Sequence, residues 1–445
     1  MKKYAPLSIA ITLAALLVFA GPVRAQFSDD VRNLYFDTLR TGDVQATPIG
    51  VADMRYVGTG YISQRDSTLM QYTTAVIRSD IDFYADFQLV LIDSFYLQLY
   101  EIKELGPLGW QRLGADYLLD LEAEILPGNL RVRWRLWDTS EKQQFAKGSA
   151  QRPKEEWRQL AHEISNDVVH TMTGEGGIFL TKICFIRDLG QGAKELFIAD
   201  YDGANERQIT HTGTINLSPA FAPYANEIYF TSYLGGDPAL YRVNLENDRV
   251  SEVASYKGMV AAPAVSPDGD KIACCLTRDD NAEIYVLGLD GRIIKRLTRH
   301  WSIDTSPTWS PDGRMIAFSS DRTGVPQIYL MDSDGLNVRR LTFQGSYNDS
   351  PIWSAQGDRI VFVSRTRAGR FDLASIDTSG LDYRLMTQTG HNQNPHFSPD
   401  GKHIIFSSDR LGNNHDIYTA DVTGRHQRRL TRYGGCTNPN WGPLR

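Results

Sequence analysis

Cysteine is scarce in this chain of 445 residues, which has only four, at positions 184, 274, 275 and 436. A disulfide-stabilised scaffold needs a much higher density of cysteine, so that class of fold is excluded. Cys274 and Cys275 are neighbours on a predicted strand, where successive side chains point to opposite faces. We therefore expect them to pack in the core rather than to form a redox pair.

Long hydrophobic runs are absent after the first 25 residues, where no stretch stays apolar for 18 residues. A transmembrane helix is therefore not expected. At the start of the chain, Lys2 and Lys3 precede a 14-residue apolar run, a Gly-Pro break and the small residue Ala25. This pattern predicts a secretory signal peptide that is cleaved after Ala25. The next residue is Gln26 where a lipoprotein would have cysteine, so we expect a soluble, exported mature protein.

Positive charge is also in short supply. Without Lys2, Lys3 and Arg24 of the predicted leader, 44 basic side chains stand against 53 acidic ones, a formal charge of −9 compared with −6 for the whole chain. Nucleic-acid-binding proteins usually carry an excess of basic residues, so nucleic acid is not the expected main partner. The charge balance favours a protein partner.

The sequence does contain an internal repeat. The stretch "SPTWSPDGRMIAFSSDR" (residues 306–322) returns as "NPHFSPDGKHIIFSSDR" (394–410) and, more faintly, as "APAVSPDGDKIACCLTR" (262–278). Proline recurs every 44 residues, with an aromatic or apolar residue two places later, at positions 219, 263, 307, 351, 395 and 439. Each unit contains four short apolar strands separated by turns rich in Gly, Asp and Pro, which is typical of a β-propeller blade.

The two ends of the repeat region predict the number of blades. Five full units begin at the prolines from 219 to 395, whereas the sixth, "NPNWG" at 438–442, has almost no chain after it. Residues 181–186, 194–200 and 206–210 read as second, third and fourth strands that lack a first one. A ring supplies both missing parts if the C-terminal strand becomes the innermost strand of the first blade. We therefore predict six blades, closed by pairing of residues 438–442 with residues 183–186.

The recurring Asp of the "SPDG" turns has a structural explanation. Pro fixes φ near −65°, Asp can accept hydrogen bonds from its own turn, and Gly adopts the positive φ that closes the hairpin. Asp268, Asp312 and Asp400 are therefore expected to be turn residues rather than catalytic groups. Gln356 stands at the equivalent place of another unit, as expected if the turn can form without a carboxylate.

Residues 26–174 show no such repeat and predict a small α/β domain. A strand is expected at 47–54, a helix at 67–84, a hairpin around the Pro-Gly-Asn turn at 127–129 and a last helix from 154 to about 172. In the hairpin, Arg131, Arg133 and Arg135 alternate with apolar residues. A solvated basic face explains this alternation as well as a nucleic-acid-binding strand does, and we favour the former. The predicted architecture is an N-terminal α/β domain followed by an all-β six-bladed β-propeller at 175–445, behind a leader at 1–25.

The chain contains, in this order, a leader, a small α/β domain, "TGEGGIF" (173–179), "IADYDGANERQIT" (198–210), Pro-x-Trp-Ser-Pro-Asp-Gly blades and a terminal "NPNWGPLR" (438–445). This order resembles the TolB family. The members are periplasmic propellers of the Tol-Pal system of Gram-negative bacteria, and the resemblance covers nearly the whole mature chain. It implies a non-enzymatic protein without cofactors that binds the peptidoglycan-associated lipoprotein (Pal) through the propeller. It also implies that the N-terminal region engages a TolA-like inner-membrane protein, and that the system maintains the outer membrane and its constriction at division. The mature N-terminus and the stretch 56–110 are longer than the family pattern.

The resemblance also suggests where the partner binds. The loops before each innermost strand and those between second and third strands are expected on one face, around the mouth of the channel. In the family the residues that contact the lipoprotein lie in these loops. Ala262 and Thr305 keep the family residue type, whereas Met259 stands where His is common. With their neighbours they form the predicted partner-binding set: Met259, Ala262, His300, Trp301, Asp304, Thr305, Asp349 and His391.

A metal site and a peptidase are two alternatives to protein docking. Four histidines fall in the predicted mouth loops, at positions 211, 300, 391 and 415, but none has the spacing of a metal motif such as HExxH, so no metal site is predicted. A propeller-gated serine peptidase would need a G-x-S-x-G elbow, which the sequence lacks, and only residues 439–445 remain after the fifth full unit. An exported propeller that binds a different protein, or a glycan, is the remaining alternative.

Overall fold

The computed structural model describes residues 46–91, 106–366, 369–412 and 414–444. The predicted leader and the extended mature N-terminus lie outside these residues. Within the described residues, no helix has both the length and the apolar character needed to cross a membrane. The chain divides after Ala46, and Thr47–Arg445 form one compact unit.

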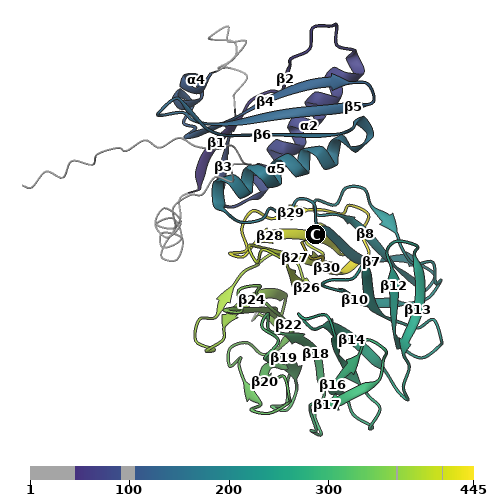
Figure 1. Ribbon diagram of the computed structural model, residues 1–445. Helices are drawn as coiled ribbons and strands as arrows, with labels where there is room; N and C mark the ends of the chain where they lie inside the picture. Colours follow the sequence, from purple (N-terminus) through teal and green to yellow (C-terminus); the bar gives the residue numbers. More distant parts are fainter. Residues whose placement is uncertain (1–45, 92–105, 367–368, 413, 445) are drawn as a thin grey trace, which may run out of the picture. The chain divides into compact units, whose positions relative to one another are not determined.

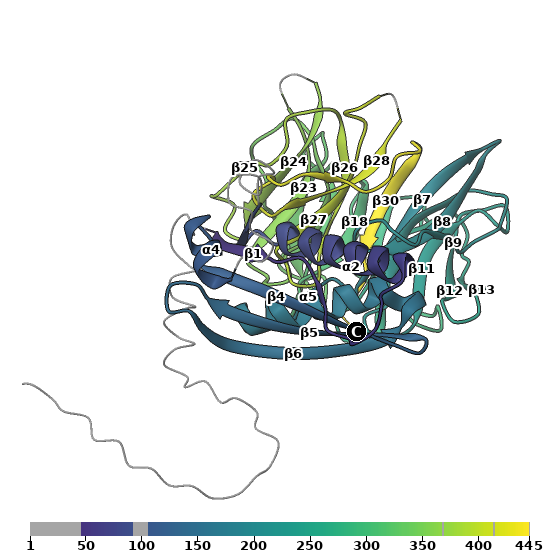
Figure 2. The same ribbon diagram turned by 90° about the horizontal axis from the view of Figure 1, so that it is seen from above.

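The first part of this unit is a mixed sheet with helices on one face (Figure 1). The strand order is β3-β1-β4-β5-β6, and the short β2 pairs with β4. Helices α2 and α5 lie side by side over this sheet (Figure 2). The bounds of these elements are β1 Thr47–Val51, β2 Arg55–Tyr56, α2 Gln64–Phe83, β3 Phe87–Val90, α4 Pro107–Arg112, β4 Tyr117–Leu126, β5 Asn129–Asp138, β6 Gln143–Pro153, the 3-10 turn η1 Lys154–Glu156 and α5 Trp157–Thr173.

The predicted hairpin and both predicted helices are confirmed, and α5 ends at Gly174 in the left-handed conformation (φ 76°). The basic residues of β5 lie on the solvent face of the sheet, where β4 supplies acidic partners. Arg131 and Arg133 both contact Glu124, at 3.0 and 2.8 Å, and Arg135 contacts Glu122. The basic stripe is therefore neutralised within the sheet, as expected of a solvated face.

Six four-stranded antiparallel sheets follow, so the predicted six-bladed propeller is confirmed. Each blade runs from an innermost strand outwards in sequence order, except the one that joins the two ends of the chain. The strands are β7 Lys182–Gly190, β8 Ala193–Asp200, β9 Arg207–Gln208 and β30 Cys436–Trp441 in the closing blade; β10 Asn216–Phe221, β11 Glu227–Ser232, β12 Ala239–Asn244 and β13 Arg249–Ala254; β14 Val260–Val265, β15 Lys271–Leu276, β16 Glu283–Gly288 and β17 Ile293–Arg296; β18 Asp304–Trp309, β19 Met315–Ser320, β20 Gln327–Asp332 and β21 Arg339–Arg340; β22 Asn348–Trp353, β23 Arg359–Arg365, β24 Phe371–Asp377 and β25 Arg384–Leu385; β26 Asn392–Phe397, β27 His403–Ser408, β28 Asp416–Asp421 and β29 Arg428–Arg429.

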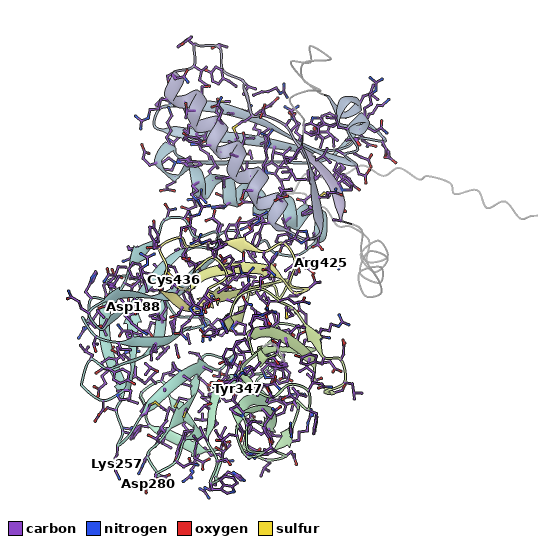
Figure 3. The ribbon with its side chains drawn as sticks, turned by 180° about the vertical axis from the view of Figure 1, so that it is seen from behind. Asp188, Lys257, Asp280, Tyr347, Arg425 and Cys436 are labelled. Atoms are coloured by element: carbon purple, nitrogen blue, oxygen red, sulfur yellow. The ribbon has the colours of Figure 1, made fainter. Side chains whose placement is uncertain are left out.

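The ring closes as predicted, because β30 pairs antiparallel with β7. Cys436 lies opposite Arg187, whereas Cys184 lies opposite Asn440, so the two cysteines are out of register for a disulfide. Both thiols are buried and free. Figure 3 shows Cys436 close to Asp188. Asp188 lies near the end of β7, whereas Cys184 lies near its start. Burial raises the pKa of the Cys184 thiol well above its usual value, so this side chain is an inert packing residue.

The "SPDG" turns confirm the structural interpretation of their Asp. In the turn at Asp312, the carboxylate accepts hydrogen bonds from the Ser310 hydroxyl (2.6 Å) and the Arg314 backbone N–H (3.1 Å). These hydrogen bonds lower the pKa of Asp312 below its ordinary value. Asp400 makes the same turn contacts but also accepts a hydrogen bond from the Tyr84 hydroxyl, at 2.8 Å.

The end of α2 therefore packs on the "SPDG" face of the propeller. Beside Tyr84, the Phe83 ring stacks on the His403 ring with 4.3 Å between centroids, and Lys402 forms ion pairs with Asp86 (2.6 Å) and Glu175 (2.8 Å). A single hydrophobic cluster runs from the α/β sheet through Phe179 into the closing blade. The α/β domain and the propeller thus share a core on this side.

We predict that deletion of residues 439–445 strongly destabilises the protein. The deletion removes Trp441, whose ring is 3 % exposed and whose indole N–H donates to the Thr181 hydroxyl at 2.9 Å. Loss of a buried Trp alone costs about 3–5 kcal/mol, which should lower the melting temperature by about 6 °C or more. Circular dichroism melting curves measure this effect, and deletion of Leu444 and Arg445 alone, beyond the strand, is the control. Equal melting temperatures for the two truncations would contradict closure by β30.

Candidate docking surface at the propeller mouth

The propeller mouth is the face opposite the "SPDG" turns, where the innermost strands begin. Two sets of loops form it. Those that lead into innermost strands are 209–215, 255–259, 297–303, 341–347, 386–391 and 430–435, and those between second and third strands are 191–192, 233–238, 277–282, 321–326, 366 with 369–370, and 409–412 with 414–415. The two sets meet, because Lys257 and Asp280 come from different loops and lie 3.9 Å apart (Figure 3).

A repeated hydrogen-bond pair anchors the loops that lead into the innermost strands. In five blades, a Thr hydroxyl after the fourth strand donates to a buried side chain within the first three residues of the third strand. The same hydroxyl accepts a backbone N–H of that strand at 2.9–3.0 Å. The five pairs are Thr210–Glu195, Thr298–Glu283, Thr342–Gln327, Thr387–Asp372 and Thr431–Asp416. The blade of β10–β13 has Ala239 and Ala254 at these positions and lacks the pair.

The recurring "FSSDR" explains how the second set of loops is tied to the first. In one copy, the Arg322 guanidinium donates to both oxygens of Asp304, at 3.0 and 2.9 Å, and lies 4.8 Å above the Tyr329 ring. The preceding Asp321 accepts the backbone N–H of Ile303 at 2.8 Å. Asp321 and Arg322 of this motif therefore both bind the segment around Ile303 and Asp304 and fix the loop that precedes β18.

The second copy of this motif makes equivalent contacts. Arg410 donates to Asn392 at 2.9 Å and lies 4.5 Å above the Tyr418 ring. Asp409 accepts the backbone N–H of His391 at 2.6 Å. Because these bonds fix the loops before any partner arrives, less conformational entropy is lost on binding.

Large apolar side chains project from the fixed loops. Trp301 is 79 % exposed, Tyr433 75 % and Phe343 67 %. Arg340 lies 4.8 Å from the Phe343 ring centroid and Arg187 lies 4.5 Å from that of Tyr433. Exposed aromatic residues on a rigid surface are typical anchors of protein interfaces. Ile303, Leu234 and Leu411 of the mouth are also exposed.

The predicted partner-binding residues differ in what they present to solvent. Trp301 is open, and the His300 ring lies 5.1 Å from its ring while His300 Nδ1 accepts the Ser302 backbone N–H at 3.1 Å. Asp304 is fully buried in β18 with its carboxylate held by Arg322, so it offers no free charge. Burial raises the pKa of Asp304 above its ordinary value even though Arg322 lies beside it. Its contribution is to position the loop that carries Trp301.

Asp304 and Asp349 do not lie in the mouth loops, where the predicted set was placed, because both belong to innermost strands. The Asp349 carboxylate accepts the Tyr347 hydroxyl at 2.9 Å. Thr305 of β18 lies opposite Ser319 of β19 and is half-buried. Each carboxylate is thus engaged within its own blade.

Met259 and His391 lie in loops that lead into innermost strands. Both are half-buried, and their backbone N–H groups donate to Thr277 and Asp409. Their assignment to a partner interface, like that of the whole predicted set, stays a prediction.

Ala262 illustrates a constraint that the sequence analysis missed. It has a φ of 51°, in the left-handed region, at a β-bulge of its innermost strand. The residue before the strand proline repeats this conformation in every blade, with φ between 48° and 54°, at Ser218, Ala262, Ser306, Ser350, Asn394 and Asn438. Side chains branched at Cβ are strongly disfavoured there, which explains why only Ala, Ser and Asn occur. The backbone conformation by itself therefore accounts for the small or polar residue before each proline.

These bulges line a channel of about 410 Å³ between the innermost strands. Its wall is largely made of the strand prolines and of aromatic rings such as Trp309 and Trp353. His396 also lines it, and burial lowers the pKa of this imidazole to about 4, so it is neutral at physiological pH. The described residues that line this channel include no charged side chain.

In the described part of the chain, no mouth histidine belongs to a group of ligand-type side chains with metal-like spacing. His211 is exposed, and burial lowers the pKa of His415. The one group of His and carboxylate side chains with metal-like spacing found among the described residues lies elsewhere, at His162, Asp200 and Asp202.

Fold and mouth define a class of protein: a six-bladed propeller with an α/β domain on one face and preorganised, aromatic-bearing loops on the other. Comparison with known protein families identifies the family within this class. Residues 169–445 match the TolB beta propeller domain and residues 38–145 match the TolB amino-terminal domain. The chain belongs to the TolB family.

Individual relatives agree with this assignment. The chain is 32 % identical over 223 residues to the Tol-Pal system protein TolB of Rickettsia felis, covering 49 % of this chain and 50 % of the relative. It is 31 % identical over 249 residues to that of Rickettsia akari, covering 55 % of each. The chain thus spans about half the length of the curated relatives it matches. The crystal structure of TolB from Acinetobacter baumannii superposes with a TM-score of 0.77 at 26 % identity, covering 90 % of this chain and 97 % of that one.

We predict that Thr342→Val lowers the melting temperature by about 2–4 °C. The substitution leaves the buried Gln327 amide without its hydroxyl partner, at a cost of about 1–2 kcal/mol. Thr323→Val, at an exposed position, is the matched control and should melt like the parent. A Thr342→Val protein that is as stable as this control would show that the pair does not anchor the loop.

Proposed function

We propose that this protein is a non-enzymatic, periplasmic component of the Tol-Pal system that binds the peptidoglycan-associated lipoprotein at the propeller mouth. The names of its relatives support membership of the system. The lack of a G-x-S-x-G elbow in the sequence and the absence of a predicted cofactor motif favour binding over catalysis. In this role the protein supports outer-membrane integrity and constriction during division.

The observation that carries the proposal is the exposure of Trp301, Phe343 and Tyr433 on loops held rigid from inside. A folded lipoprotein domain is too large for the channel, so its affinity must come from loops at one end. At the other end, Asp400 and Lys402 are already engaged by the α/β domain. This leaves the mouth as the favoured docking face.

We further propose that the N-terminal region engages a TolA-like inner-membrane protein, which would make the chain a link between the two membranes. Residues 26–46, which are unusually long for the family, are the candidate segment. They lie ahead of Thr47–Arg445, the compact unit that contains the mouth. The two partners would then bind independent parts of the chain.

Substitutions at the mouth should weaken lipoprotein binding without unfolding the protein. Trp301→Ala, Phe343→Ala or Thr305→Ile should each cost about 1–3 kcal/mol of binding free energy, because anchor residues dominate interface energetics. Titration calorimetry against the soluble domain of the cognate lipoprotein measures the affinity, and circular dichroism checks the fold.

The matched control is Tyr224→Ala, which removes an aromatic side chain that is 81 % exposed in a turn of the "SPDG" face. Asp312→Asn is a second control from the same face. Both should bind with parental affinity. Loss of binding in these two variants, with normal affinity in the mouth variants, would place the lipoprotein on the wrong face for this proposal.

Removal of residues 26–46 from the mature chain should abolish capture of a TolA-like periplasmic domain while leaving the lipoprotein affinity unchanged. Surface-attached full-length and truncated proteins would be compared against both partners in the same binding assay. Equal capture of the TolA-like domain by the two forms would exclude this segment as its binding site.

A further inference from the structure

A cluster of potential metal ligands, two of them buried, lies where helix α5 meets the closing blade. His162 comes from α5, Asp200 ends β8 and Asp202 lies in the turn that follows. One imidazole nitrogen and one oxygen from each carboxylate all lie within 4.8 Å of one another. We propose that this cluster is a binding site for a divalent cation of the zinc class, which would connect the α/β domain to the propeller.

The orientation of His162 is the first argument. Its Nδ1 lies 2.9 Å from a carboxylate oxygen of the fully buried Asp80. Asp80 also accepts the hydroxyl of Tyr201, whose pKa burial raises well above its usual value, so Asp80 is surrounded by donors. The Nδ1 nitrogen is therefore assigned the proton, and Nε2 carries the free lone pair. Metal-binding histidines are commonly oriented by a carboxylate in this way.

The isolation of Nε2 is the second argument. His162 is only 3 % exposed, and this nitrogen has no hydrogen-bond partner among the described residues. A buried polar atom without a partner costs free energy. Oxygens of Asp200 and Asp202 lie within 4.8 Å of an imidazole nitrogen of His162. An ion between them would use the lone pair and complete the ligand set.

The carboxylates are balanced by cations that a metal ion can replace. Asp202 contacts the guanidinium of Arg158, whose Nε lies 3.8 Å from Asp200, and Asp200 contacts Lys182. The Lys182 side chain is 52 % exposed, so it can move into solvent at little cost. Arg158 is 23 % exposed and is the principal competitor for the site. Metal binding therefore has to displace Arg158.

The surroundings provide a route of entry. Lys182 and Asn205, which both bind Asp200, line a surface cavity of about 270 Å³. The Asp202 side chain is itself 22 % exposed. The carboxylate side of the cluster therefore borders solvent.

The chemical types of the three ligands indicate which metal ion the site would bind. One imidazole and two carboxylates match the ligand types of Zn²⁺, which takes water as a fourth ligand at sites with three protein ligands. Ca²⁺ and Mg²⁺ prefer oxygen ligands only, in higher coordination numbers. Because the ligands come from both α5 and the closing blade, a bound ion should stabilise the folded chain by mass action.

Calorimetric titration of the mature full-length protein with Zn²⁺, after removal of metals by chelation, tests the proposal. We expect one Zn²⁺ per chain, a rise in melting temperature that depends on Zn²⁺ concentration, and no such effect with Ca²⁺. Co²⁺ should bind as well and give visible absorption bands characteristic of low coordination. Arg158→Met should tighten Zn²⁺ binding at least tenfold, because it removes the competing guanidinium, whereas a purely structural ion pair predicts no gain.

A variant of one proposed ligand and a control variant of a histidine elsewhere distinguish binding at this site from adventitious binding. Asp202→Asn keeps the shape of a partly exposed side chain and should weaken Zn²⁺ binding at least tenfold. His426→Gln removes a histidine that also pairs with a carboxylate, Asp421 at 2.7 Å, but is 63 % exposed, and it should bind Zn²⁺ like the parent. Absence of Zn²⁺ binding by both the parent and Arg158→Met, or equal affinity of Asp202→Asn and the parent, would overturn the proposal.

Discussion

The pairing of β30 with β7 is the interaction on which the rest of the structure depends. It makes a blade from the two ends of the propeller and so removes the open sheet edges that an unclosed ring would expose. Its Trp441 side chain packs 6.5 Å from both Phe83 and His403, at the contact with α2. One strand of six residues therefore closes the ring and supports the α/β domain.

This closure divides the propeller into two faces with different roles. On one face, the α/β domain packs against turns such as that of Asp400. Asp400, a turn residue that recurs in other blades, therefore also binds Tyr84 of the α/β domain. On the other face, repeated internal pairs such as Thr342 with Gln327 hold the loops while their tips vary. Constant anchors with variable tips are what a binding surface built on a repeated scaffold requires. The proposed recognition of a lipoprotein rests on this division.

Much of the fold was predictable from the sequence because the repeat is regular. The spacing of 44 residues gave the blades, and the incomplete units at both ends predicted closure in the observed register. The long edge strand β6 was missed, since its residues alternate only weakly between polar and apolar. The site was harder to predict from the sequence, because the position of a residue along the chain does not reveal its burial. Asp304 resembles a loop carboxylate in the sequence, but it is buried and bound by Arg322, 18 residues away. Phe343 and Tyr433 could have been found, since both follow the recurring position of the anchoring Thr within their repeats.

The central claim, that partner recognition belongs to the mouth face, is tested most directly by hydrogen–deuterium exchange of the full-length protein with and without the soluble lipoprotein domain. The account predicts slower exchange on binding in peptides that cover loops 297–303, 341–347 and 430–435. Peptides that cover the "SPDG" turns and helix α2 should exchange at the same rate in both samples. Protection confined to the turns, with no change in the mouth loops, would contradict it.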